Sequence, residues 1–202
     1  MRIIQKMFFA LITSASLLST GAATADDIAA REQTARATSG ALLQQLGGTL
    51  KQELQTGGPE KAITVCRDIA PKIANELSIT NGWKVTRVGT RVRNPLLGMP
   101  DDWERRVLAD FEARAAKGEA YKDMVFGEVV KTGSVKQYRF AKAIPVQENC
   151  LLCHGSAEQI PDVVKAKLKN TYPHDMAKGY KVGDLRGAVS IIQPLDIPLV
   201  GK

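Results

Sequence analysis

The feature that most constrains this chain is the pentapeptide Cys150-Leu-Leu-Cys153-His154, followed by Gly155. Two cysteines separated by two residues, with a histidine next, have the attachment spacing of a c-type haem. Each thiol adds across one vinyl group of the porphyrin, so both sulfurs must reach neighbouring ring edges from one short turn. The adjacent imidazole then binds the iron as its proximal ligand. The spacing therefore predicts one haem c, bound covalently through Cys150 and Cys153, with His154 on the metal.

Two other interpretations of these residues remain open. They are a disulfide between Cys150 and Cys153, and a zinc site that uses both thiols together with His154. Zinc needs a fourth ligand, and the sequence contains no second paired motif. The pattern favours haem over both alternatives.

The N-terminus has the pattern of an export signal. Arg2 and Lys6 form a basic start, residues 7–18 are mostly apolar, and residues 23–25 form a small-x-small cleavage site. The apolar run is too short for a comfortable membrane span, and cleavage near Ala25 removes it. Covalent haem attachment in bacteria takes place outside the cytoplasm, so the two signals agree. We expect a signal peptide over residues 1–25 and a periplasmic protein.

Residues 26–202 are enough for a single domain with a hydrophobic core. The formal net charge of the chain is +7, to which Arg2 and Lys6 of the signal contribute. The other basic residues occur in small scattered groups, which is typical of a solvated surface and compatible with docking to an acidic redox partner. No nucleic-acid partner is expected for an exported protein. No segment after the signal is apolar enough for stable membrane insertion.

The first half of the chain is predicted to be helical. Leucines recur with a helical period within residues 27–55, and Gly57-Gly58 ends this helix. Pro59 suits the first turn of a second helix. Pro71 lies inside that second helix and predicts a kink just past Cys66. The apolar stripe of the second helix, which turns Cys66 inward, consists of Ala62, Cys66, Ile69, Ile73 and Leu77.

Cys66 has two interpretations. It is a small buried hydrophobe, as free cysteines often are, or it is a thiolate bound to the iron opposite His154. Spacing alone favours the first interpretation. A lone thiol in an oxidising compartment nevertheless needs an explanation, because it is open to oxidation and mispairing, and iron ligation supplies one.

The second half of the chain changes character. Alternating and β-branched runs predict strands, and two shorter periodic segments predict helices. The order of helices first and a mostly antiparallel sheet afterwards predicts an α+β domain. The expected strands cover residues 83–88, 124–130, 135–143 and 185–192, and the expected helices cover residues 101–117 and 162–168.

Six stretches of the chain, spread in order over nearly all of residues 26–202, resemble the Tll-like haem domain family. They are Val-Cys-Arg-Asp-Ile-Ala-Pro at 65–71, Arg-Val-Arg-Asn-Pro at 91–95, Pro-Asp-Asp-Trp-Glu at 100–104, the motif at 150–155, Tyr-Pro-His-Asp-Met-Ala at 172–177 and Gly-Asp-Leu-Arg-Gly-Ala at 183–188. The resemblance implies a PAS-like fold, an antiparallel sheet with flanking helices that holds one covalently bound c-type haem. It also implies an iron held by the motif histidine and a cysteine thiolate, here His154 and Cys66.

One loop departs from the family pattern. Between Pro95 and Pro100 a shorter link with an asparagine is expected, and this chain has Leu-Leu-Gly-Met instead. Before that loop, Arg87, Arg91 and Arg93 alternate, which sends their side chains to one side if the segment is extended. Arg91 and Arg93 are therefore candidates to bind the haem propionates, and ordinary surface charge is the alternative.

Other candidate iron ligands are fewer. His174 is the only other histidine, and it occupies a position that the family motif leaves free, so we expect it in a turn or on the surface. Met99, Met124 and Met176 each carry a thioether, although methionine more often fills a core.

An iron held on both faces has no open site for substrate. The favoured hypothesis is therefore a one-electron carrier or a redox or small-gas sensor rather than an enzyme, with nitric oxide or carbon monoxide as the candidate gases. Such a protein passes its electron or signal to a redox or signalling partner. The alternatives are a small haem enzyme such as a peroxidase, which needs an open distal face with an acid or base, and a structural haem protein.

Overall fold

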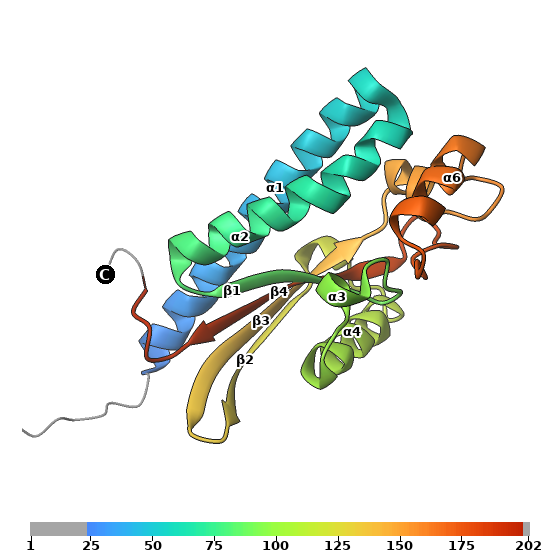
Figure 1. Cartoon of the computed structure of the whole chain (residues 1–202). Coiled ribbons are helices and arrows are strands. Elements are labelled where there is room, and N and C mark those ends of the chain that lie inside the picture. The colour runs from blue at the N-terminus through green and yellow to red at the C-terminus, as the bar shows by residue number, and fades with distance from the viewer. Residues whose placement is uncertain (1–23, 200–202) are drawn as a thin grey trace, which may run out of the picture.

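The computed structural model describes residues 24–199, and its centre is a four-stranded antiparallel sheet. Neighbouring strands follow the order β1-β4-β3-β2, so the first strand of the chain pairs with the last (Figure 1). A hairpin with a two-residue turn, Gly133-Ser134, joins β2 to β3, and Gly133 has a positive φ. The strands are β1 (Lys84–Gly89), β2 (Val125–Thr132), β3 (Val135–Pro145) and β4 (Leu185–Pro194).

Both faces of the sheet are covered by helices, because the strands carry apolar residues on both sides. Successive side chains of a strand point to opposite faces. Phe140 of β3 and Val189 of β4 belong to the core beneath α1 (Ala25–Thr64) and α2 (Ala70–Asn81), whereas their neighbours Ala141 and Ala188 belong to the core beneath α4 (Asp102–Ala115). Figure 1 shows α1 and α2 on one side of the sheet and α4 on the other. Each fully buried large apolar side chain in these layers contributes about 1.5–3 kcal/mol.

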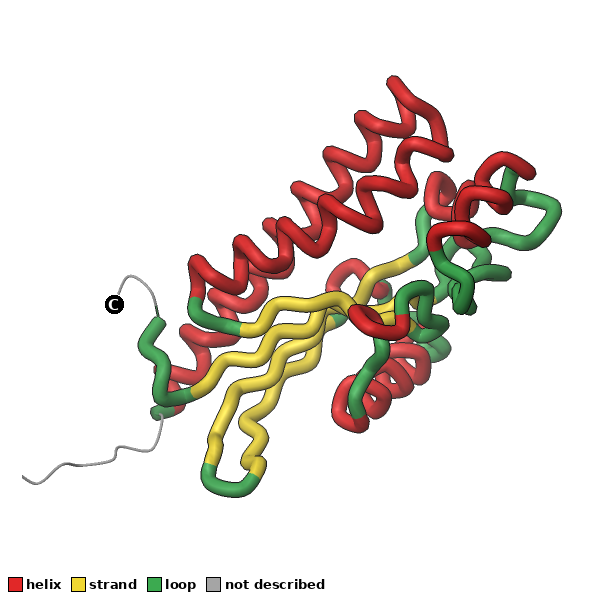
Figure 2. The backbone as a smooth tube through the Cα atoms, viewed as in Figure 1, coloured by secondary structure: helices red, strands yellow, loops and turns green. Residues whose placement is uncertain are grey.

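The long helix α1 is sharply bent at Gly58. The backbone there has φ 71° and ψ 179°, a conformation open in practice only to glycine. The chain reverses direction at this point, so residues after Gly58 run back alongside the earlier part of α1 (Figure 2). Pro59 follows directly, in a first-turn position where its missing N–H costs nothing.

A π-helical turn, η1 (Val65–Ile69), connects α1 to α2 and contains Cys66. The backbone N–H of Ala70 donates to the carbonyl of Val65, five residues earlier, instead of four. Pro71 is the second residue of α2 and has no N–H, so the regular helical ladder is interrupted here. Insertions of this kind widen a helix by one residue and often occur at functional sites.

Short helices and loops connect the strands on the α4 side of the sheet and at the end of the sheet where β1 ends. A capping box begins α4: the side chain of Asp101 accepts from the N–H of Glu104, and the side chain of Glu104 accepts from the N–H of Asp101. The remaining elements are α3 (Pro95–Gly98), η2 (Tyr121–Asp123), η3 (Glu148–Cys150), α5 (Leu151–His154) and α6 (Asp162–Thr171).

The α+β class predicted from the sequence is confirmed, and the narrower PAS-like relationship stays a prediction. Every expected strand and helix is present with ends shifted by a few residues. The kink expected at Pro71 is a π-helical turn just before it. The Leu-Leu-Gly-Met stretch that departs from the family pattern lies mostly in the one-turn helix α3, which Asn94 caps through its side chain.

The predicted signal peptide lies outside the described residues, except for Thr24 and Ala25. These two form the N-cap and the first residue of α1. None of the helices within residues 24–199 combines the length and the apolar composition that a bilayer crossing needs.

The bend at Gly58 can be tested against a glycine that is truly helical. Gly58→Ala should destabilise the protein by about 1–3 kcal/mol, because alanine must occupy a positive φ. Gly47→Ala, in an exposed and sterically open helical position of α1, should stabilise it by about 0.5–1 kcal/mol. Denaturant unfolding followed by circular dichroism measures both changes. Equal changes in the free energy of unfolding for Gly58→Ala and Gly47→Ala would contradict the bend at Gly58.

Candidate functional site

The motif predicted to attach haem lies on η3 and α5, beyond the end of β3. Cys150 ends η3, and Cys153 and His154 end α5. The two cysteines are three positions apart along a helical turn, so their side chains share one face. All three cysteines of the chain are free thiols, so the structure contains no disulfide between Cys150 and Cys153. No group of three His, Cys, Asp or Glu side chains within residues 24–199 is arranged to hold a metal ion by itself.

Gly155 is required where α5 ends. Its N–H donates to the carbonyl of Leu151 at 2.9 Å. A Cβ at this position would lie 2.7 Å from that same carbonyl oxygen, closer than real Cβ contacts. The absence of a side chain therefore lets the chain turn away tightly behind the motif.

His154 is held by one hydrogen bond in the orientation that a metal ligand needs. Its Nδ1 lies 2.7 Å from the carbonyl oxygen of Ala177, and because a carbonyl can only accept, Nδ1 carries the proton. The lone pair is then on Nε2. Burial lowers the pKa of His154 well below its usual value, and the charges of Arg93 and Arg186 add to this, so the imidazole is neutral. A neutral ring with a free Nε2 is the form that binds iron.

The segment that supplies the Ala177 carbonyl is paired with the motif through the backbone. The N–H of Gly179 donates to the carbonyl of Gly155 at 2.7 Å, and the N–H of Tyr180 donates to the carbonyl of His154 at 2.9 Å. The Tyr180 ring also meets the imidazole edge to face, with centroids 6.1 Å apart. These contacts fix the position of His154 relative to the loop of residues 177–180.

Arg93 and Asp175 form a buried ion pair beside the motif. Arg93 Nε and Asp175 Oδ2 are 3.1 Å apart, and the two side chains are only 8% and 2% exposed. Arg93 Nη2 donates to the carbonyls of Cys153 and Ala177. The guanidinium is thus engaged with the protein itself.

Cys66 reaches the same region from the helical layer. Ile63, one turn before it, packs with residues of α6, and Cys153 and Tyr172 lie against this cluster. Burial raises the pKa of the Cys153 thiol to about 11, the charge of Arg93 opposes this rise, and nearby Cys66 adds to it. The helical segment that leads into the turn of Cys66 therefore packs on the same apolar cluster as Cys153, although 87 positions of chain order separate Cys66 from Cys153.

The three alternating arginines have different surroundings. Arg87 is half-buried in β1 near Cys66, and burial lowers its pKa. Arg91 is exposed, with its guanidinium 3.8 Å above the centre of the Tyr180 ring, and Arg93 is buried against Asp175. They do not converge on one partner, and whether Arg91 and Arg93 bind propionates stays a prediction.

The other candidate iron ligands lie either in the core or on the surface of the protein. His174 is exposed in the turn after Tyr172. Met124 is fully buried in the core beneath α4, whereas Met99 and Met176 are 57% and 70% exposed.

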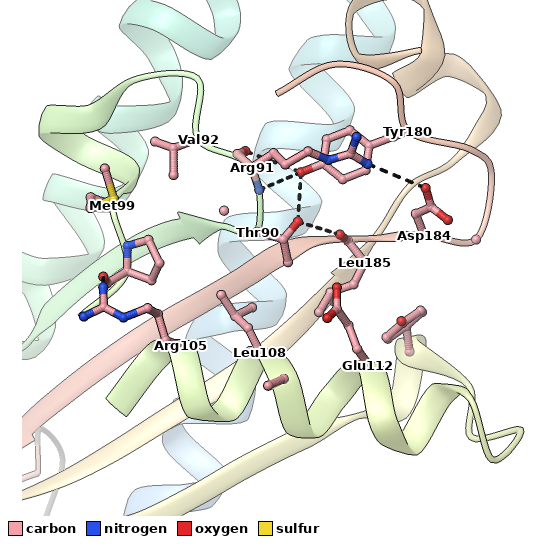
Figure 3. A pocket seen from close by; sticks show the side chains of 15 residues that line it. Thr90, Arg91, Val92, Met99, Arg105, Leu108, Glu112, Tyr180, Asp184 and Leu185 are labelled. Carbon is pink, nitrogen blue, oxygen red and sulfur yellow. Dashed lines mark hydrogen bonds and ion pairs between the residues drawn. The ribbon is translucent and has the colours of Figure 1, made fainter. Parts of the chain in front are cut away.

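An open cavity of about 780 Å³ lies on the α4 side of residues 89–92. Figure 3 shows Arg91 and Tyr180 on its upper wall and Arg105, Leu108 and Glu112 of α4 below. None of the predicted haem residues except Arg91 lines it. The Tyr180 hydroxyl lies 2.8 Å from Thr90 Oγ1 and accepts from the N–H of Arg91 at 2.9 Å, so Tyr180 joins this wall to His154.

Sequence reasoning missed three residues that hold the site, which are Asp175, Ala177 and Tyr180. Asp175 and Ala177 belong to the fifth stretch quoted for the family resemblance, and that stretch was the one available signal. Their roles depend on contacts with a motif more than twenty positions earlier in the chain.

With this geometry in hand, the chain can be placed in a class, an α+β domain in which a Cys-x-x-Cys-His turn is held by a following loop. The family model for the Tll0287-like domain, Tll0287, matches residues 13–194, and the chain belongs to that family. The resemblance seen in the motifs is thereby confirmed.

The solved structure of the cyanobacterial heme-protein Tll0287 is similar to this chain. It superposes with a TM-score of 0.60 at 26% sequence identity, covering 86% of this chain and 98% of that chain. None of the curated proteins matches the sequence.

The role of the Tyr180 hydroxyl can be tested with a second tyrosine. Tyr180→Phe should destabilise the protein by about 1–3 kcal/mol, because it removes the buried hydroxyl that accepts from the Arg91 N–H and bonds to Thr90, which keeps only its bond to the Leu185 carbonyl. Tyr121→Phe is the matched control, since its hydroxyl has no hydrogen-bond partner among the described residues. Thermal unfolding measures both variants, and an unchanged midpoint for Tyr180→Phe would contradict the assignment.

Proposed function

We propose that this chain binds one haem c covalently through Cys150 and Cys153, with His154 and Cys66 as the axial ligands of the iron. Three findings support the proposal. The chain belongs to the Tll0287-like family, the solved Tll0287 structure is that of a heme-protein, and the two cysteines and the histidine of the attachment motif lie, all partly buried, where η3 continues into α5. The observation that carries it is the hydrogen bond between Nδ1 of His154 and the Ala177 carbonyl, which leaves Nε2 free for a metal, beside an apolar cluster shared by Cys153 and the helix turn before Cys66.

The side chains present fit a haem. Two free thiols share one face of a short turn, and the neutral imidazole is oriented by the hydrogen bond from its Nδ1 to the carbonyl of Ala177. Leu96 of α3 is 93% exposed, Met176 directly before Ala177 is 70% exposed, and the N–H of Met176 donates to the carbonyl of Val92. Exposed apolar surface of this kind commonly marks a ligand-binding site.

The proposed haem supplies reversible one-electron chemistry, and the protein side chains set its conditions. Cys66 donates negative charge, which favours the ferric state and a low reduction potential. His154 occupies the opposite face through Nε2. Arg91 and Arg93 are the proposed partners of the propionates, and Arg87 is a further half-buried guanidinium near Cys66. With two protein ligands in place, substrate has no position on the metal.

The function that follows is electron transfer or redox sensing. The protein is proposed to be a periplasmic cytochrome of PAS-like fold, exported by the signal peptide at residues 1–25. Its partner is a redox or signalling protein that accepts the electron or the signal. In the sensing case, release of Cys66 on reduction leaves a position for a diatomic gas.

Attachment through the motif is tested by its cysteines. Cys150→Ser and Cys153→Ser should each reduce the haem that survives denaturation, and the double substitution should abolish it, because a hydroxyl does not form the thioether. A haem stain of a denaturing gel and a pyridine haemochrome assay measure this. Cys66→Ala is the matched control and should retain covalent haem. Full covalent loading of the double variant would contradict the attachment.

Ligation by Cys66 is tested through the reduction potential. Cys66→Ala should shift the potential to more positive values and remove the thiolate features of the ferric absorption spectrum, because the charge donor is lost. Spectroelectrochemistry of the purified holoprotein measures both. His174→Gln, which changes an exposed histidine, should leave both unchanged. If the Cys66→Ala protein keeps the wild-type spectrum and potential, Cys66 is not a ligand.

A further inference from the structure

The buried ion pair of Arg93 and Asp175 lies directly behind the imidazole of His154. The two charged side chains are almost fully removed from water, and Nε and Oδ2 are 3.1 Å apart. Burying two charges is costly unless further hydrogen bonds satisfy them. Here each partner makes such bonds, and each of them leads to the backbone around His154.

Asp175 fixes the position of Ala177. Its Oδ1 accepts a hydrogen bond from the N–H of Ala177 at 2.8 Å, two residues further along the chain. This arrangement closes a tight turn, in which a carboxylate takes the part of a backbone acceptor. The carbonyl of Ala177 is thereby aimed at Nδ1 of His154.

Arg93 ties the two sides of the site together. Its Nη2 donates to the carbonyl of Ala177 at 3.3 Å and also to the carbonyl of Cys153, the residue before His154. A carbonyl oxygen has two lone pairs, so Ala177 can accept from Arg93 and His154 at once. One guanidinium nitrogen, Nη2, therefore bonds both the histidine's own turn and the group that orients its ring, while Nε faces Asp175.

We propose that Arg93 and Asp175 are positioning residues for His154, which fix its tautomer and ring orientation through the Ala177 carbonyl. This inference rests on the proposed function, because it concerns His154 as an iron ligand. A ligating histidine that donates its second ring N–H to a fixed acceptor is a stronger donor to the metal. The pair therefore helps to set a low reduction potential and a single ligand geometry.

The test separates the charge of Asp175 from its hydrogen bond. Asp175→Asn and Asp175→Ala remove the same charge, but only asparagine keeps an oxygen that can accept from the N–H of Ala177. Asp184→Asn is the control, because Asp184 also accepts a backbone N–H, from Lys181 at 2.8 Å, and its other contact is the ion pair with Arg91 rather than a bond to Ala177. The readouts are the reduction potential and the low-temperature electron paramagnetic resonance spectrum of each holoprotein.

Both Asp175 variants should have a more positive potential than wild type, and Asp175→Ala should have the more positive of the two. The g-values should be shifted in Asp175→Ala and close to wild type in Asp175→Asn and Asp184→Asn. If the alanine variant does not fold, Arg93→Lys serves instead, because lysine keeps the charge but lacks the guanidinium group. It should shift the g-values as well.

Identical g-values for wild type, Asp175→Ala and Arg93→Lys would overturn the inference. Equal potentials and spectra for the alanine and asparagine variants would also overturn it, because charge alone would then explain the effect. Either result leaves haem binding intact, since the wild-type protein still shows its haem. A wild-type protein without haem would instead overturn the proposed function.

Discussion

The hydrogen bond between Nδ1 of His154 and the carbonyl of Ala177 is the contact around which this site is built. It decides which ring nitrogen carries the proton and which is free. It also depends on a loop that returns to the motif after α6 and pairs with it through two backbone hydrogen bonds. Tyr180, which lies in this loop, ties it to the sheet, because its hydroxyl bonds to Thr90 and Arg91 in the turn after β1. The orientation of one imidazole thus depends on three separate parts of the chain.

The second constraint comes from the helical layer. The bend at Gly58 sends the chain back along α1, and the π-helical turn before Pro71 carries Cys66 towards the motif. A regular α-helix through residues 65–69 would rotate each later side chain to a different direction. The irregular turn changes the direction of the side chains around it, so the helical pair buries its apolar stripe on the sheet while Cys66 stays half-buried. Wide turns of this kind are often retained for function.

Much of this arrangement could be predicted from the sequence. Strand and helix positions follow from local periodicity, and the attachment motif follows from the fixed spacing of its residues. The inward direction predicted for Cys66 from the apolar stripe of its helix is met only in part, because its side chain is half-buried. The partners of Arg93 could not be predicted, because Ala177 is 84 positions away and the contact is made only in the folded chain. The three alternating arginines suggested one shared direction, but only Arg87 lies in a strand, and the chain turns before Arg91 and Arg93. The π-helical turn was missed as well, since proline indicates an interruption without specifying its form.

The central claim is that sulfur and imidazole hold one iron from opposite sides. The low-temperature electron paramagnetic resonance spectrum of the purified, oxidised wild-type protein tests it most directly. The account predicts a low-spin ferric signal of the thiolate–imidazole type from a single haem per chain. A high-spin signal from a water-bound iron, or a bis-imidazole signal, would contradict it.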